Sequence, residues 1–388
     1  MEQVLRSEPP VRPPLPSSPE ELPAIFEYFR EMRDSHPVVL DEGTGVAWYH
    51  LFRHDDVTRV LNDHARFSSA VGVFEGTPFT DTMLVKDPPD HRKLRSLVNL
   101  AFTPRAVARL ADRIGELTTR LLDRVRERGE MDVVADLAAP LPSWVISEML
   151  GMPEADWEAV QAWAVRFTGP DSGVGAEMRA YFGGLADERR RAPRDDLVTA
   201  LVEAEIDGEG LTERELVNFC SLLFLAGQET TKNLIANFFL TLSDHPDVQA
   251  RLTAEPALMP GAIEEVLRTL PPVWFVMRRS TAEVELGGVR IPAGQMVLPW
   301  TASANRDETQ FADAERFDIT RDPNRHLAFG YGVHFCVGAP LARLEARVAL
   351  PIMLERLRSL RVRRDEPISI EAGIVFMIQR LGLAFEPY

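Results

Sequence analysis

The sequence predicts one large, mainly α-helical domain with small β-sheets, and three observations lead to this prediction. Residues 103–129 and 212–243 carry helix signals over unusually long stretches. Residues 284–300 instead combine short apolar runs with Gly and Pro turn signals, which is typical of strands. Neither an internal repeat nor a clear linker interrupts the chain after its N-terminal arm. We therefore expect the helices and strands to share one domain.

A proline-rich arm, residues 1–24, precedes this domain, which we assign to residues 25–388. Seven prolines fall within the first 23 residues, and this favours an arm that is extended on the body or partly disordered. Residues 44–52 follow with alternating and aromatic side chains, a pattern that indicates a strand.

Two long helices are expected in the body of the chain. The first has Thr103 as N-cap, Pro104 at the first helical position and Gly129 at its end. Its apolar residues form one stripe at three- and four-residue spacing: Val107, Leu110, Ile114, Leu117, Leu121 and Val125. The second begins with a capping-box pattern at Thr212 and Glu215, and its roughly thirty residues would span about 45 Å. It is apolar on nearly every face, so we expect it to be a buried central helix.

Residues 284–300 are expected to form two strands around the turn Gly287–Gly288, followed by another turn at residues 292–294. These strands complete a fold in which sheets are a minor component.

Composition narrows the class of protein. The formal net charge of −16 repels phosphate backbones, so nucleic acid is not an expected partner. Two cysteines are too few for a disulfide framework and fit a reducing cytoplasm. The N-terminus lacks the apolar core of a signal peptide, and no segment is long and apolar enough to span a membrane. We expect a cytoplasmic monomer without a membrane partner.

One stretch, FGYGVHFCVG from Phe329 to Gly338, concentrates unusual residues around Cys336. Glycine permits positive φ and close approach of backbone or ligand, and three glycines surround this one cysteine. The cysteine could be structural, or a nucleophile with His334 as its base. A zinc site would need further ligands that the neighbouring sequence lacks. A single thiolate does suffice as the axial ligand of a haem iron.

The same ten residues resemble the haem-binding signature F-G-x-G-x-H-x-C-x-G of the cytochrome P-450 superfamily at every fixed position. The resemblance implies the P-450 fold and haem b (iron protoporphyrin IX) with the Cys336 thiolate as axial ligand. It also assigns Phe329, Gly330, His334 and Gly338 to the cofactor-binding loop. Cys220, on the long central helix, receives only a structural interpretation.

Further motifs follow in the order that this family shows. The segment EEVLR resembles the E-x-x-R element and supplies Glu265 and Arg268, while AERF supplies Arg316 as the third member of a buried structural triad. The family usually has proline where this chain has Ala314. We expect the three charged residues to support the cysteine loop.

Four basic residues are implied to hold the haem propionates. His91 and Arg95, in DPPDHRKLR, are four residues apart and would share one helical face. Arg278 resembles the propionate arginine that follows the E-x-x-R helix, with Arg279 as the alternative. His334 would be the fourth contact, because carboxylates in an apolar cavity need cationic partners.

The centre of the long helix, AGQETT, resembles the family's oxygen-binding groove. Alone, these residues would indicate a helix kink with hydroxyls bonded back to carbonyls. Within the family pattern, Ala226 and Gly227 leave room for dioxygen. Glu229 and Thr230 are then the acid and the alcohol that relay protons, and are the catalytic residues.

Family precedent places substrate contacts in residues 71–84, 162–178, 271–277 and 373–379, where most side chains are apolar. An apolar small molecule is therefore expected as the substrate, although the same side chains are common core fillers. The candidate pocket residues are Val71, Phe74, Leu223, Val273, Trp274, Val276, Val375 and Phe376.

The resemblance thus implies a soluble, bacterial-type monooxygenase that inserts one oxygen atom from dioxygen by hydroxylation or epoxidation. A peroxide-driven peroxygenase and a haem sensor or carrier are the alternatives. Two separated cysteines cannot hold an iron–sulfur cluster, so we expect electrons from a ferredoxin or flavodoxin with an NAD(P)H-dependent reductase. Basic residues near the haem motifs are candidates for docking this donor: Arg92, Lys93, Arg343 and Arg347.

Overall fold

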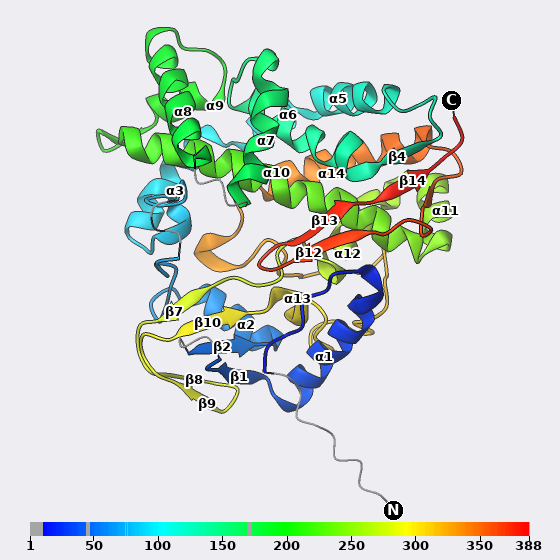
Figure 1. Ribbon diagram of the computed structural model, residues 1–388. Coiled ribbons are helices and arrows are strands. Elements are labelled where there is room, and N and C mark those ends of the chain that lie inside the picture. The colour runs from blue at the N-terminus through cyan, green and yellow to red at the C-terminus, as the bar shows by residue number, and fades with distance from the viewer. Residues whose placement is uncertain (1–10, 44–46, 74, 76, 169–172, 388) are drawn as a thin grey trace, which may run out of the picture.

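A computed structural model describes residues 11–43, 47–73, 75, 77–168 and 173–387. Helices dominate. Strands β1, β2 and β7 to β10 lie with α1 in the lower part of Figure 1, whereas β4, β12, β13 and β14 lie beside the helices. The helices are α1 (Leu22–Ser35), α2 (His54–Asn62), α3 (Asp90–Ala101), α4 (Pro104–Ala108), α5 (Ala111–Asp123), α6 (Pro140–Met149), α7 (Trp157–Thr168), α8 (Val174–Arg191), α9 (Leu197–Glu203), α10 (Glu213–Ser243), α11 (Pro246–Ala254), α12 (Met259–Thr269), α13 (Thr301–Ala304) and α14 (Ala339–Arg356). Shorter 3₁₀ turns are η1 (Pro19–Glu21), η2 (Met83–Val85), η4 (Glu154–Asp156), η5 (Pro256–Leu258) and η6 (Gly332–His334), and η3 (Val134–Ala138) is a π-turn.

The largest sheet has five strands in the order β1-β2-β10-β7-β3. Strand β2 pairs with β10 in parallel, Trp48 opposite Met296, and the other pairs of this sheet are antiparallel. The strands are β1 (Val38–Asp41), β2 (Trp48–Leu51), β3 (Phe67–Ser68), β4 (Glu130–Asp132), β5 (Glu205–Ile206), β6 (Glu209–Gly210), β7 (Arg278–Ser280), β8 (Val284–Leu286), β9 (Val289–Ile291), β10 (Met296–Pro299), β11 (Arg361–Val362), β12 (Ser369–Ala372), β13 (Phe376–Arg380) and β14 (Gly382–Ala384). The smaller sheets join β11-β14-β4, β12-β13, β5-β6 and β8-β9.

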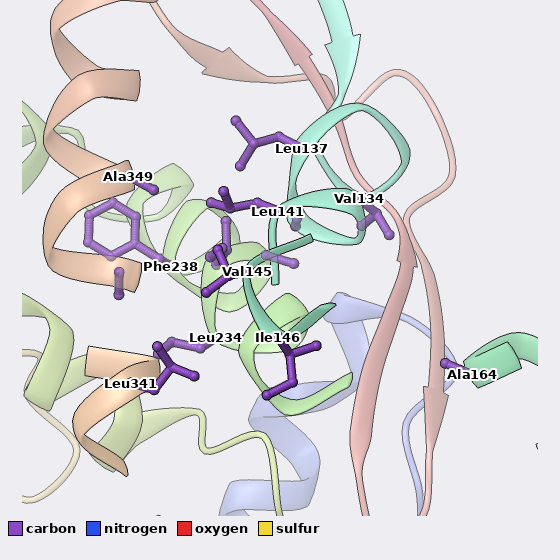
Figure 2. Packing of buried hydrophobic residues seen from close by; sticks show 14 of the residues in the cluster. Val134, Leu137, Leu141, Val145, Ile146, Ala164, Leu234, Phe238, Leu341 and Ala349 are labelled. Carbon is purple, nitrogen blue, oxygen red and sulfur yellow. The ribbon is translucent and has the colours of Figure 1, made fainter. Parts of the chain in front are cut away.

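The central helix α10 is confirmed as the long, buried helix that the sequence predicts. Thr212 caps its N-terminus in a reciprocal capping box with Glu215, and 31 residues follow. Figure 2 shows Leu234 and Phe238 of α10 between α6 and α14, where they meet side chains of both helices. The core therefore forms around α10, and the candidate catalytic residues lie in its middle.

The other predicted elements are present with changed bounds. The strand expected over residues 44–52 is β2, Trp48–Leu51, and residues 44–46 lie outside the described residues. The helix expected to run from Thr103 to Gly129 ends at Asp123 and is divided in two. Thr103 caps a helix through a bond from the Ala106 amide, but that helix ends at Ala108 and α5 begins at Ala111. Between the two helices, the Leu110 amide donates to the Val107 carbonyl three residues earlier, which is a 3₁₀-type hydrogen bond. The strands around Gly287–Gly288 are β8 and β9, and β10 follows the next turn.

The described part of the N-terminal arm lies against the body. Pro13 and Pro16 are buried, and Arg12 forms a salt bridge with Asp41 of β1. The assigned boundary at residue 24 lies inside α1, which begins at Leu22, so the arm and the domain are continuous in structure.

Candidate active site

The cysteine loop runs from Leu327 to the start of α14. The Cys336 amide donates to the Phe329 carbonyl at 2.9 Å, and the Gly330 amide donates to the Leu327 carbonyl at 2.9 Å, so the loop closes on itself. Gly332 has a φ of 70°, and a Cβ there would lie 3.0 Å from the Leu61 carbonyl oxygen of α2. Glycine at this position is therefore required by both the backbone angle and the close approach.

Cys336 lies in the wall of an interior space. Its side chain is exposed, yet burial raises the pKa of its thiol. Both observations hold if protein surrounds a space beside the sulfur rather than filling it. Backbone hydrogen bonds from Gly338 and Ala339 and the positive charge of Arg95 act in the opposite direction and favour the thiolate. Cys220, in contrast, is buried within α10, and burial raises its pKa to about 12.

Three basic side chains meet next to this loop. The rings of His91 and His334 lie 4.2 Å apart between centroids, and Arg278 is close enough to lower the pKa of both. Burial is the largest cause of each shift, and the pKa of His334 falls to about 3 and that of Arg278 to about 10. Arg95 adds a fourth basic side chain and donates to the Phe335 carbonyl at 2.8 Å.

Among the described residues, this cluster has more basic side chains than acidic ones around it. Both ring nitrogens of His91 are buried without a hydrogen-bond partner among the described residues. Asp87 is the acid that acts on His91 and Arg278, and it also bonds the Ser69 amide. Four basic side chains beside a cavity that holds one thiol fit a ligand that carries carboxylates, as haem does with its two propionates.

The structure distinguishes between the two candidate arginines of β7. Arg278 is buried and belongs to the basic cluster, whereas Arg279 is exposed and donates to the Val71 carbonyl at 3.0 Å. Alternation along the strand points them to opposite faces.

The middle of α10 is also partly open. Ala226 is exposed although Leu225 and Gln228 beside it are buried, so this side of the helix borders an interior space. Thr230 is half-buried one turn later, and its hydroxyl donates to the Ala226 carbonyl at 2.8 Å. The helix remains continuous through these residues, and this bond satisfies the hydroxyl without a break.

Gly227 differs from the expectation that it leaves room for dioxygen. A Cβ at this position would lie 3.5 Å from Ile146 of α6, which is an ordinary contact. Gly227 therefore faces α6 rather than the open side that Ala226 faces.

Sequence reasoning did not identify the partner of Glu229. The Nζ of Lys232 lies 2.6 Å from a carboxylate oxygen of Glu229, one turn away on the same helix. The sequence does contain a signal for this ion pair, because a lysine follows an acid by three residues inside a helix with apolar residues on nearly every face.

The structural triad is present with a different third member. Arg268 makes two bonds of 2.8 Å to the Glu265 carboxylate, and neither side chain is exposed. The second cation on Glu265 is Arg321, at 3.2 Å, whereas the Arg316 side chain is 67% exposed and reaches only Asp318. Arg316 contributes its backbone carbonyl alone, so its assignment to the triad was wrong.

The triad connects to the cysteine loop through Asn305. Arg268 donates to the Asn305 carbonyl at 2.9 Å, and the Asn305 side chain accepts a 2.6 Å bond from the Leu327 amide. Leu327 is the residue on which the cysteine loop closes. The buried charges therefore fix the position of that loop through one intermediate residue.

The candidate pocket residues divide into two groups, and Phe74 lies outside the described residues. Val273, Val276 and Val375 are partly exposed, whereas Val71 and Leu223 are nearly buried. Trp274 and Phe376 have no exposed surface and stack with ring centroids 5.1 Å apart in the core.

The assignment of Trp274 and Phe376 to the pocket was therefore wrong. Val273 and Val375 form a β-bridge, and successive side chains of extended chain point to opposite sides. Because Trp274 and Phe376 point into the core, their neighbours Val273 and Val375 point away from it.

Two of the four candidate docking residues form ion pairs within the protein. Arg343 makes two bonds of 2.7 Å to Glu264 of α12, and Lys93 is paired with Glu209. Arg92 and Arg347 are exposed.

No three His, Cys, Asp or Glu side chains of the described residues gather as ligands for a metal ion. In the same part of the chain, every helix is too short or too polar to cross a membrane.

Known proteins are similar to this chain over most of its length. A family model described as cytochrome P450 matches residues 184–385. Cyclomarin C epoxidase CymV of Salinispora arenicola is 42% identical, over 87% of this chain and 90% of that protein. Erythromycin C-12 hydroxylase of Saccharopolyspora erythraea is 41% identical, over 88% of this chain and 89% of that protein. The crystal structure of CYP109E1 from Bacillus megaterium in complex with corticosterone has a TM-score of 0.88 and 36% identity, and the match covers 95% of this chain and 100% of that one.

Proposed function

The chain belongs to the cytochrome P450 family, and on this premise we propose that Cys336 is the thiolate that holds its haem iron. The family implies a monooxygenase with haem and a cysteine axial ligand. Of the two cysteines, Cys220 is buried among apolar side chains of α10. The observation that carries the proposal is the basic cluster beside Cys336, in which the buried ring nitrogens of His91 have no hydrogen-bond partner among the described residues.

Each residue of the cluster then has a role that its contacts support. His91, Arg95, Arg278 and His334 would hold the two propionates, whose negative charges would add to that of Asp87. The amides of Gly338 and Ala339 stabilise negative charge on the sulfur. When bound, haem supplies the iron centre at which dioxygen is activated.

We assign proton delivery to Glu229 and Thr230. Thr230 lies one helical turn from Ala226, on the side of α10 that borders the interior space. Its hydroxyl can donate a proton toward that space and be re-protonated by the Glu229 carboxyl, its neighbour along the chain. A positioned acid of this kind contributes about 10²–10⁴-fold in rate.

An apolar small molecule is the proposed substrate, and hydroxylation or epoxidation is the proposed reaction. The named relatives include an epoxidase and a hydroxylase, and a related structure holds corticosterone. Val273, Val276 and Val375 are the partly exposed candidates for its binding surface. Electrons are proposed to come from a ferredoxin or flavodoxin with its NAD(P)H-dependent reductase, docking near Arg92 and Arg347.

A comparison of electron sources tests this function. The haem-loaded protein is first titrated with an apolar compound library, and binding is measured from the spin-state change of the haem. The compounds that bind are then incubated with NADPH, ferredoxin, reductase and oxygen, or with hydrogen peroxide alone. We expect oxygenated product with the complete redox system. Product with peroxide alone would indicate a peroxygenase, and binding without product under either condition would favour a sensor or carrier.

A further inference from the structure

Lys232 is an unusual residue at its position. Three of the 43 lysine and arginine residues of the chain are lysines, and Lys232 is the one that lies inside the central helix. Its side chain is only 6% exposed. Burying an ammonium group is expensive unless an opposite charge compensates it, so a buried lysine in this helix needs a partner.

That partner is the proposed catalytic acid. Among the described residues, Lys232 has one polar partner, the Glu229 carboxylate, and the Glu229 side chain is 19% exposed. A pair three residues apart on an exposed helix contributes a few tenths of a kcal/mol and is screened by water. Here the surrounding protein excludes most of the water, so the charges interact more strongly.

The backbone of the same turn is held in place. Asn233 donates from its amide group to the Glu229 carbonyl at 2.7 Å and accepts a 3.1 Å bond from the Ile378 amide of β13. The turn that carries Glu229 is thus attached to a neighbouring strand, and the Lys232 ion pair fixes the direction of its carboxylate.

We propose that Lys232 is a positioning residue for the proton relay and stabilises the carboxylate that Glu229 becomes after it gives up a proton. The inference rests on the proposed function of Glu229 and Thr230. At rest, Glu229 is the carboxylate partner of Lys232. In each cycle it takes up a proton from a hydronium ion of the solvent and gives that proton to the Thr230 oxygen while the Thr230 hydroxyl proton moves on. Glu229 thereby returns to the carboxylate that pairs with Lys232. Without Lys232, the donation leaves an unpaired, largely buried carboxylate and becomes slower.

The test is a double-mutant cycle with Lys232→Met and Glu229→Gln. Lys232→Met is expected to lower turnover about 10-fold, less than the range for loss of the proton donor itself, with substrate affinity unchanged. Product formed per NADPH falls as well. Lys232→Arg, which keeps the charge, restores most of the turnover, and Lys232→Gln behaves like Lys232→Met. In the Glu229→Gln background, Lys232→Met has no further effect.

A readout independent of turnover accompanies the cycle. In the resting protein, Lys232→Met should produce the infrared band of a protonated carboxyl group, and Glu229→Gln should remove that band. The matched control is Arg30→Met, which breaks an exposed pair with Glu27 at the same spacing in α1 and should change neither readout.

Two results would overturn the inference. The first is that Lys232→Met leaves both turnover and the infrared spectrum unchanged. The second is that Lys232→Met lowers turnover equally in the parent and in the Glu229→Gln background, as expected for a purely structural lysine. If Glu229→Gln alone leaves product per NADPH intact, the proposed role of Glu229 fails instead, so the two failures are distinguishable.

Discussion

Replacing Arg321 with alanine should destabilise the protein far more than replacing Arg316. Arg321 is nearly buried, donates to Glu265 and also bonds the carbonyls of Ala312 and Asp313. Removing one partner of a buried ion pair costs about 3–5 kcal/mol. We take about 3 kcal/mol, because Arg268 remains to compensate Glu265. Arg316→Ala removes an exposed contact of 3.6 Å, which contributes about 0–1 kcal/mol.

Thermal unfolding with the haem absorbance as the signal measures this difference. The unfolding entropy is about 2.1 cal/mol/K per residue, or about 0.8 kcal/mol/K for this chain, so 3 kcal/mol corresponds to about 4 °C. Arg321→Ala should therefore unfold about 4 °C below the parent protein and retain less haem, because the network fixes the cysteine loop through Asn305. Arg316→Ala should unfold within about 1 °C of the parent. Equal losses in both variants, or a larger loss in Arg316→Ala, would refute the assignment of Arg321.

Three further predictions concern the relay, the loop and the docking surface. Thr230→Ala should retain haem and substrate affinity but divert electrons to hydrogen peroxide, and unchanged product per NADPH would contradict this. Burial raises the pKa of Glu264, but hydrogen bonds from Arg343 and His326 outweigh it and lower the pKa to about 2 from an ordinary 4.5. A carboxyl group with a lowered pKa stabilises the fold at pH values above its ordinary pKa. The stability advantage of the parent protein over Glu264→Gln should therefore disappear as the pH falls from about 4.5 to about 2. An advantage that persists at pH 2 would argue against the pair. Charge reversal at Arg92 and Arg347 should slow the first electron transfer and weaken its salt dependence, whereas unchanged kinetics at low ionic strength would place docking elsewhere.

Motifs that depend on local spacing were predictable from the sequence. The capping box at Thr212 needs only neighbouring residues, and so does the helical face that His91 and Arg95 share. The cysteine loop was predictable for the same reason, since Gly330 and Gly332 adopt the positive φ that glycine permits.

Features that depend on distant packing were not predictable. Arg316 and Arg321 both follow the E-x-x-R helix by about fifty residues, and only the fold of residues 312–324 determines which guanidinium reaches Glu265. Trp274 and Phe376 have the composition of a pocket lining, yet the β-bridge between their neighbours points both into the core.

The reduced carbon monoxide spectrum tests the central claim, that Cys336 is the thiolate ligand of the haem, most directly. The parent protein should show the strongly red-shifted Soret band of thiolate ligation, and Cys336→His should lose that band while Cys220→Ser keeps it. The Cys220→Ser variant controls for a general effect of cysteine replacement, because Cys220 is buried in α10. A band that survives in Cys336→His, or disappears in Cys220→Ser with haem still bound, would contradict the assignment.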